Sequence, residues 1–67
     1  MPLDHTGLLV IRASVENGSS KPLRARVRLT TDVAAGLGSE TTLADVNAVA
    51  AAVEVWLRDV LLDGRPL

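Results

Sequence analysis

The chain has 67 residues, a formal charge of −1, no cysteine and one histidine, and Trp56 is its single aromatic residue although 48% of the residues are hydrophobic. This length allows one domain, and the composition excludes disulfides, thiolate metal sites and a histidine-based metal cluster within one chain. Because a domain this small buries only about 60% of the surface that its unfolded chain exposes, oligomerisation is the remaining source of stability, and we expect a homodimer.

Two predicted strands follow a polar N-terminal segment, residues 1–6, that we expect to be flexible. Apolar residues recur at every second position over residues 7–16 and again, in strict alternation, over residues 23–31. A period of two is typical of strands with one buried face. The intervening residues 17–22 read NGSSKP, a cluster of turn formers. The pattern therefore predicts an antiparallel β-hairpin.

The register of this hairpin is restricted, because paired positions must sum to an even number if the apolar faces are to coincide. A sum of 38 pairs Arg12 with Arg26, and a sum of 40 pairs Arg12 with Arg28. Either register places two arginines opposite each other on the outer face, where like charges are mildly destabilising.

The outer face of the hairpin is the candidate contact surface for a partner or for nucleic acid, and it comprises Arg12, Arg24, Arg26 and Arg28. Arginines at this spacing would contact successive phosphates of a nucleic acid or the acidic groups of a protein. Strand alternation alone also accounts for them as a solvated face whose long side chains shield the backbone. The charge of −1 and the lack of aromatic residues on this face make nucleic acid the less favoured partner.

The rest of the chain predicts one long helix after a looser, glycine-containing stretch. Its GLG sequence lacks the pattern of a phosphate-binding loop and indicates a bend. Residues 40–44 would add a short third strand, and residues 45–62 predict the helix. Asp45 is a good N-cap residue, and Gly64 followed by Pro66 is a stop signal.

This helix carries two apolar stripes. The first is expected to pack on the hairpin, and it comprises Val46, Val49, Ala50, Val53, Trp56, Leu57, Val60 and Leu61. The second lies on the opposite side and comprises Ala48, Ala51, Val55 and Leu62. One small sheet cannot cover both stripes, so the second stripe is the candidate oligomer interface, with the free strand edges as the alternative. The second stripe would also be explained if small alanine side chains are simply tolerated on a solvated face of the helix.

The predicted architecture is an α+β domain, β-β-(β)-α, in which the hairpin packs one face on the C-terminal helix. The expected core comprises Leu9, Ile11, Ala13, Val15, Leu23, Ala25, Val27, Leu29, Val46, Val49, Val53, Trp56, Leu57 and Val60.

Catalytic chemistry has little support in the sequence. His5 is the one conventional base near neutral pH, and it lies in the N-terminal segment, where we expect it to be exposed. Asp59 and Asp63 stand one helical turn apart, but they lack a third ligand and are typical of a solvated face. We therefore expect no enzyme, no metal and no cofactor; an active site would have to combine groups from two chains.

Residues 41–67 resemble the C-terminal part of the HicB-type antitoxins, in which a strand leads into a helix with a recognisable sequence pattern. The matching positions are Thr42, Leu43, Asp45, Ala48, Ala52, Glu54, Trp56, Leu57, Leu61, Asp63, Gly64 and Pro66. The resemblance implies a small β-β-β-α unit, a partial ribonuclease-H fold, that oligomerises and neutralises a toxin that cleaves messenger RNA. The family's Pro-Gly-Cys passage before the helix is replaced here by GLGSETT.

We expect a small, non-catalytic protein-interaction module, homodimeric, that binds a partner protein. The alternatives are a HicB-like antitoxin and a protein that binds nucleic acid through its arginine-rich strand. No apolar run approaches the roughly 20 residues that span a bilayer, and the first residues lack the basic region of a signal peptide, so we expect a cytoplasmic protein without membrane contact. The abundance of Arg, Ala and Val is typical of GC-rich bacterial genomes.

Overall fold

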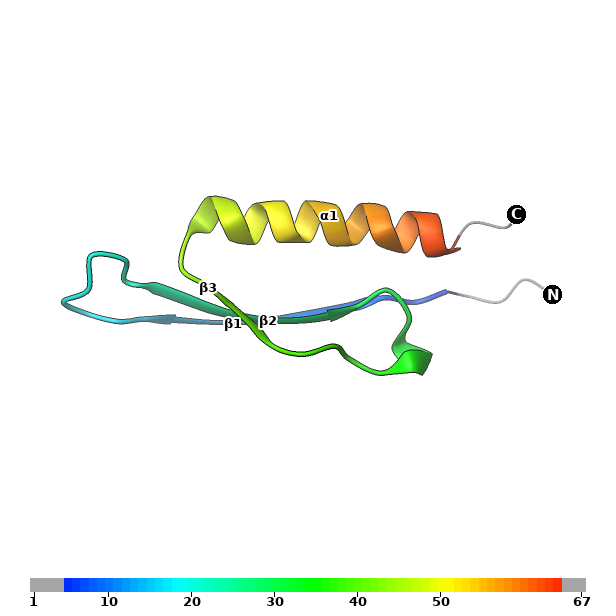
Figure 1. Cartoon of the computed structure of the whole chain (residues 1–67), viewed down its shortest axis with the longest axis horizontal. Coiled ribbons are helices and arrows are strands. Elements are labelled where there is room, and N and C mark those ends of the chain that lie inside the picture. Colours follow the sequence, from blue (N-terminus) through cyan, green and yellow to red (C-terminus); the bar gives the residue numbers. More distant parts are fainter. Residues whose placement is uncertain (1–4, 65–67) are drawn as a thin grey trace.

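The computed structural model describes residues 5–64 and contains one three-stranded sheet and one long helix. The elements in chain order are β1 (Leu8–Val15), β2 (Leu23–Thr30), a short 3-10 helix η1 (Val33–Ala35), β3 (Thr41–Leu43) and α1 (Val46–Gly64). The sheet is antiparallel in the order β1-β2-β3, and α1 lies along one of its faces (Figure 1). The predicted β-β-(β)-α fold is confirmed, including the short third strand. Residues 1–4 of the segment expected to be flexible lie outside the described residues.

The hairpin adopts the register in which paired residue numbers sum to 38, so that Arg12 lies opposite Arg26. At the loop end the backbone N–H of Glu16 donates to the carbonyl of Pro22 (2.7 Å). Gly18 in the loop has a φ of 85°, a conformation that glycine adopts without steric cost. The turn chemistry thereby selects one of the two registers that alternation left open.

Asp45 caps the start of α1, as its residue type predicts. Its carboxylate accepts a hydrogen bond from the backbone N–H of Ala48 (3.0 Å), and its carbonyl accepts one from Val49 (3.1 Å). The helix then continues to Gly64, two residues past the predicted end. With 19 residues it is about 28 Å long, similar to an eight-residue strand of about 26 Å.

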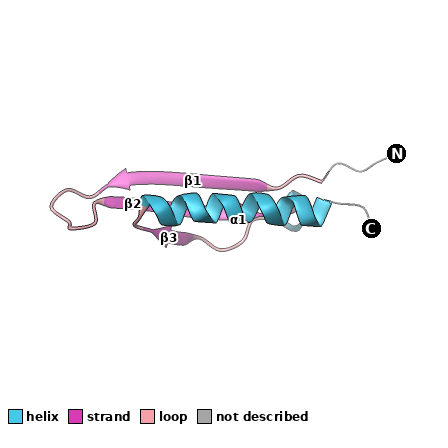
Figure 2. Cartoon of the chain, turned by 90° about the horizontal axis from the view of Figure 1, so that it is seen from above, coloured by secondary structure: helices cyan, strands magenta, loops and turns pink. Residues whose placement is uncertain are grey.

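α1 lies over the central strand β2, with β1 on one side and β3 on the other (Figure 2). The indole N–H of Trp56 donates to the carbonyl of Thr30 (2.9 Å), which holds the Trp56 side of the helix against the sheet. Helix periodicity then brings Ala48 and Ala52 toward the sheet as well, and both are half-buried. The first apolar stripe therefore faces the sheet in part, through Val49, Val53, Trp56 and Val60, which are half-buried. The helix is rotated so that the rest of that stripe, Val46, Ala50, Leu57 and Leu61, is exposed.

This orientation produces a core smaller than the predicted one. Among the described residues, Ala25 (1% exposed) and Val27 (4%), both on β2 under the helix, are the ones that are fully buried. The expected core was wrong at positions that the structure leaves exposed, which are Ile11, Ala13, Val15, Val46 and Leu57. The physical reason on the sheet side is width: a helix about 10 Å across that is centred on β2 reaches about 5 Å to either side, so β1, one strand spacing of about 4.8 Å away, lies at its edge and is only partly covered.

Candidate interaction surfaces

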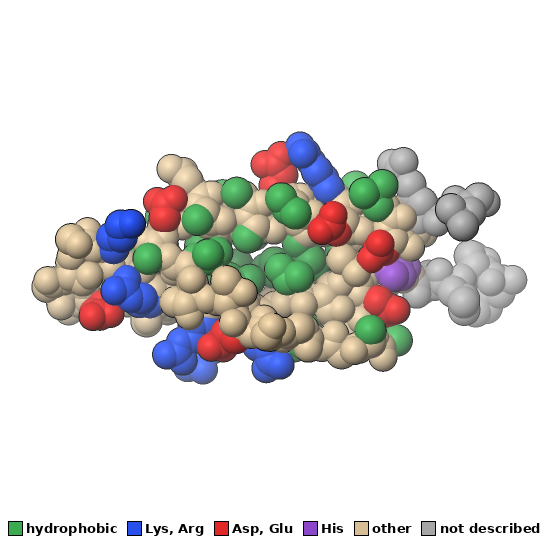
Figure 3. All heavy atoms as spheres, viewed as in Figure 1, with side chains coloured by type: hydrophobic (Ala, Val, Ile, Leu, Met, Phe, Trp, Pro, Cys, Tyr) green, Lys and Arg blue, Asp and Glu red, His purple; other side chains and the backbone are tan. Residues whose placement is uncertain are grey.

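The arginine face lies on the side of the sheet opposite α1. Arg12, Arg26 and Arg28 are exposed, and basic and acidic side chains gather below the sheet in the space-filling view (Figure 3). No element of the described residues covers this face, since α1 packs on the other one. The four predicted contact residues therefore share one face, as strand alternation requires.

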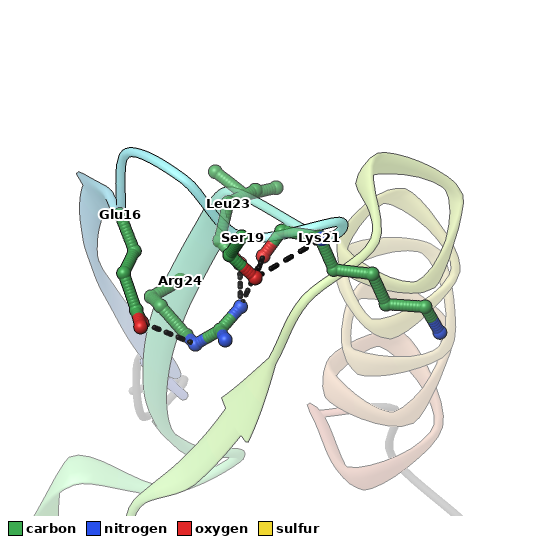
Figure 4. A network of polar contacts seen from close by, with 5 residues as sticks. All are labelled: Glu16, Ser19, Lys21, Leu23 and Arg24. Atoms are coloured by element: carbon green, nitrogen blue, oxygen red, sulfur yellow. Dashed lines mark hydrogen bonds and ion pairs between the residues drawn. The ribbon is translucent and has the colours of Figure 1, made fainter.

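Arg24 is held by its own hairpin (Figure 4). Its Nε lies 3.2 Å from a carboxylate oxygen of Glu16, and its Nη1 donates to the carbonyls of Leu23 (2.9 Å) and Lys21. The hydroxyl of Ser19 closes the loop with hydrogen bonds to the backbone of Lys21 (3.1 Å each). Arg24 is half-buried, and its contacts stabilise the loop end of the hairpin.

Two of the remaining arginines also have polar contacts within the chain, one a long ion pair and one a hydrogen bond. The Nε of Arg26 lies 4.0 Å from a carboxylate oxygen of Glu40, and the Nε of Arg28 donates to the carbonyl of Gly38 (3.3 Å). Within residues 5–64, Arg12 is the one of the four that has no such contact. The arginine face is thus partly neutralised by the segment that leads into β3.

A groove of about 570 Å³ lies between α1 and the β3 side of the sheet, and it opens toward the viewer in Figure 3. Its apolar lining comprises Val27, Leu29, Leu43, Ala48, Ala51, Ala52, Val55 and Trp56, and its polar lining includes Ser39, Thr41 and Asp59. Three residues of the predicted oligomer interface, Ala48, Ala51 and Val55, line this groove. The fourth, Leu62, is exposed farther along the helix.

The opposite flank of α1 presents a second apolar surface, which we call the β1-side surface. It comprises the exposed residues Ile11, Ala13 and Val15 of β1 and Val46, Leu57 and Leu61 of α1. These helix residues lie on the flank away from the groove by helix periodicity. Val60 shows which flank of α1 faces β1. Its Cγ2 would lie 2.6 Å from a Cβ built on Gly7, the residue before β1. Sequence reasoning missed this surface because it assigned five of these residues to the core and placed Leu61 in the helix stripe expected to pack on the hairpin.

Within residues 5–64 no three His, Cys, Asp or Glu side chains gather closely enough to hold a metal ion. His5, expected to be exposed, is half-buried against Gly64, and its Nε2 is buried without a hydrogen-bond partner in the described part of the chain. No helix in that part is long and apolar enough to cross a membrane.

Comparisons of the chain with protein-family models, curated proteins and solved structures give no match. The resemblance of residues 41–67 to HicB-type antitoxins therefore stays a prediction.

Proposed function

We propose that the chain is a non-catalytic protein-interaction module that acts as a homodimer and binds a partner protein. The observation that carries this proposal is the amount of uncovered apolar side chain. Eleven large hydrophobic side chains of the described residues are 36–70% exposed, whereas the buried ones among these residues are Ala25 and Val27. Exposed apolar patches of this kind mark protein contact sites.

Covering these exposed side chains would release a free energy that is large for so small a domain. Complete burial of a Val, Leu or Ile side chain contributes about 1.5–3 kcal/mol. Covering the five large aliphatic side chains of the β1-side surface, which are 38–70% exposed, would therefore contribute about 4–8 kcal/mol. This is comparable with the whole stability of a small domain, about 5–15 kcal/mol, so a second protein surface is a strong source of stabilisation.

The two apolar surfaces lie on opposite flanks of α1, so a second copy and a partner protein would not compete for the same residues. The groove supports the partner contact, since it is mostly apolar and open at the surface. The arginine face supports a nucleic-acid contact less well, because Arg24 and Arg28 donate hydrogen bonds within the chain and Arg26 lies 4.0 Å from the carboxylate of Glu40.

Three measurements on the purified chain test this proposal. Sedimentation equilibrium should give twice the chain mass of 7.0 kDa. A partner captured from the source cells and identified by mass spectrometry should bind native protein, lose binding to Val55→Asp in the groove, and retain binding to Arg12→Glu. Titration with single-stranded and duplex oligonucleotides at low salt, where phosphate contacts are strongest, should show no binding. A monomer, capture that is insensitive to Val55→Asp, or tight oligonucleotide binding would each contradict the proposal.

A further inference from the structure

We propose that two copies of the chain join edge to edge along β1, forming one continuous six-stranded antiparallel sheet with both helices on the same face. This inference rests on the proposed homodimer and specifies its interface. It differs from an interface built on the second apolar stripe of α1, which lies on the groove side of the helix.

The free edge of β1 has the properties of a pairing edge. β1 is the outer strand of the three-stranded sheet, and its eight residues, LLVIRASV, contain no proline or lysine and one charged side chain. Its pairing with β2 runs without a break from Leu8 to Val15, so no bulge turns the edge away. Proteins usually protect such an edge with charged side chains, proline, a bulge or a covering element. Within residues 5–64, β1 has one such feature, the side chain of Arg12, and it has no proline, bulge or covering element.

The backbone hydrogen bonds show which groups of β1 point outward. The N–H of Glu16 donates to Pro22 on the β2 side. Because successive residues of a strand direct their N–H and C=O groups to opposite sides, the even-numbered residues of β1 face β2. The odd-numbered residues therefore present their backbone groups at the free edge. The N–H of Gly38 donates to the carbonyl of Leu29 (3.1 Å) on the β3 side of β2. This bond agrees with the same alternation, because odd-numbered residues of β2 then face β3 and even-numbered ones face β1.

The same odd-numbered residues carry the apolar side chains that face the α1 side of the sheet, and these residues are Leu9, Ile11, Ala13 and Val15. Two antiparallel copies that satisfy their free backbone groups must place odd positions opposite odd positions. Such pairing keeps both apolar faces, and both helices, on one side of the joined sheet. The backbone and the side chains thus require the same class of arrangement.

Charge then selects the register. Sums of paired residue numbers of 22 and 24 both give a long overlap of the two strands. A sum of 24 places Arg12 opposite Arg12 of the second copy, which with Arg26 of each chain makes a row of four arginines across the sheet. A sum of 22 pairs residues 8–14 of the two copies, placing Ile11 opposite itself and Arg12 opposite Val10. The two-fold axis therefore passes at Ile11.

The distance between the two helices leaves room for the exposed apolar side chains. The two β2 strands would lie three strand spacings apart, about 14 Å, and α1 lies over each of them. Helices in direct contact are about 8–10 Å apart, so the space between the two helices has room for Leu57 and Ile11 of both copies. Leu57 and Ile11 are 50% and 38% exposed in the single chain, so this space would cover side chains that the fold of one copy leaves open.

Two lysine substitutions on α1 separate this interface from the alternative. Leu57 (50% exposed) and Val55 (56%) have similar exposure and lie on opposite flanks of the helix. In sedimentation equilibrium over a concentration series, Leu57→Lys should raise the Kd of the dimer at least about tenfold, as loss of a central interface contact does. Val55→Lys should change it by less than about twofold, as expected for a site outside an interface.

A third variant, Ala13→Pro, tests the backbone pairing itself. Proline at an odd position of β1 removes an N–H that points to the free edge and leaves the hydrogen bonds to β2 intact. Ala13→Pro should dissociate the dimer while the far-UV circular dichroism spectrum stays native. If Leu57→Lys fails to fold, this variant alone tests the β1 interface. If the dimer persists in both Leu57→Lys and Ala13→Pro, or if Val55→Lys dissociates it, the β1 interface is wrong, although the chain is still a homodimer. A native chain that is monomeric at all concentrations overturns both.

Discussion

Gly7 is the position at which a single methyl group should have the clearest effect on stability. It precedes β1, and a Cβ built there would lie 2.6 Å from Cγ2 of Val60, 3.0 Å from the carbonyl oxygen of Thr30 and 3.4 Å from Cζ2 of Trp56. The first two approaches are too close for ordinary contact. The Val60 side chain is branched and stiff, and the Thr30 carbonyl is backbone that already accepts the Trp56 hydrogen bond.

The expected cost of Gly7→Ala follows from two opposing effects. Loss of glycine freedom in the unfolded chain would stabilise the protein by about 0.4–1 kcal/mol, because Gly7 does not need a positive φ. Forcing an extra methyl into a packed site costs about 1–3 kcal/mol. The net loss should therefore be about 1 kcal/mol, which lowers the Tm by roughly 4–8 °C in a domain of this size.

Thermal and urea unfolding, followed by circular dichroism at one fixed protein concentration, would measure this loss. Gly64→Ala is the matched control at the same end of the molecule, since its Cβ would meet His5 at an ordinary 3.4 Å. It should be neutral or stabilising by up to about 1 kcal/mol in a helix. In a Val60→Ala background, Gly7→Ala should cost clearly less, because the closest clashing atom is gone. An equal cost in both backgrounds, or a native-like Gly7→Ala, would refute the close packing of this corner.

Three further substitutions test other contacts, each by urea unfolding. Trp56→Phe removes the hydrogen bond to the Thr30 carbonyl and should cost about 1–3 kcal/mol; a cost near zero would mean that this bond does not orient α1. Asp45→Ala removes the N-cap and should cost about 1 kcal/mol, whereas Asp45→Asn should preserve most of the stability. Glu16→Gln breaks the partly exposed ion pair with Arg24 and should cost less than about 1 kcal/mol, and this cost should shrink in high salt; a larger, salt-independent loss would contradict the assignment.

The sequence predicted the elements of this fold well because each depends on local chemistry. Alternation located both long strands, and Asp45 located the helix start, since a side chain that caps a helix acts within its own turn. The register needed one further observation, the hydrogen bond between Glu16 and Pro22 at the loop. Strand pairing is set by turn geometry as well as by the apolar pattern.

The orientation of the helix could not be predicted in the same way. Helix periodicity leaves the rotation of the helix about its axis open, and this rotation depends on tertiary contacts such as the hydrogen bond from the Trp56 indole to the carbonyl of Thr30. That contact moves Leu57 from the expected core to the surface and brings Ala48 toward the sheet. The arginine face was located correctly by alternation, but the partners of Arg24 and Arg26 depend on how the loop and the segment before β3 fold back.

Residue-level amide hydrogen exchange along β1 tests the edge-to-edge pairing most directly. In a dimer paired at Ile11, the amides of Leu9, Ile11 and Ala13 donate to the second copy, so they should be protected, and dilution below the Kd should remove that protection. The even-numbered amides, which face β2, should stay protected throughout. Rapid exchange of these three odd-numbered amides at concentrations where sedimentation shows a dimer would contradict the β1 interface.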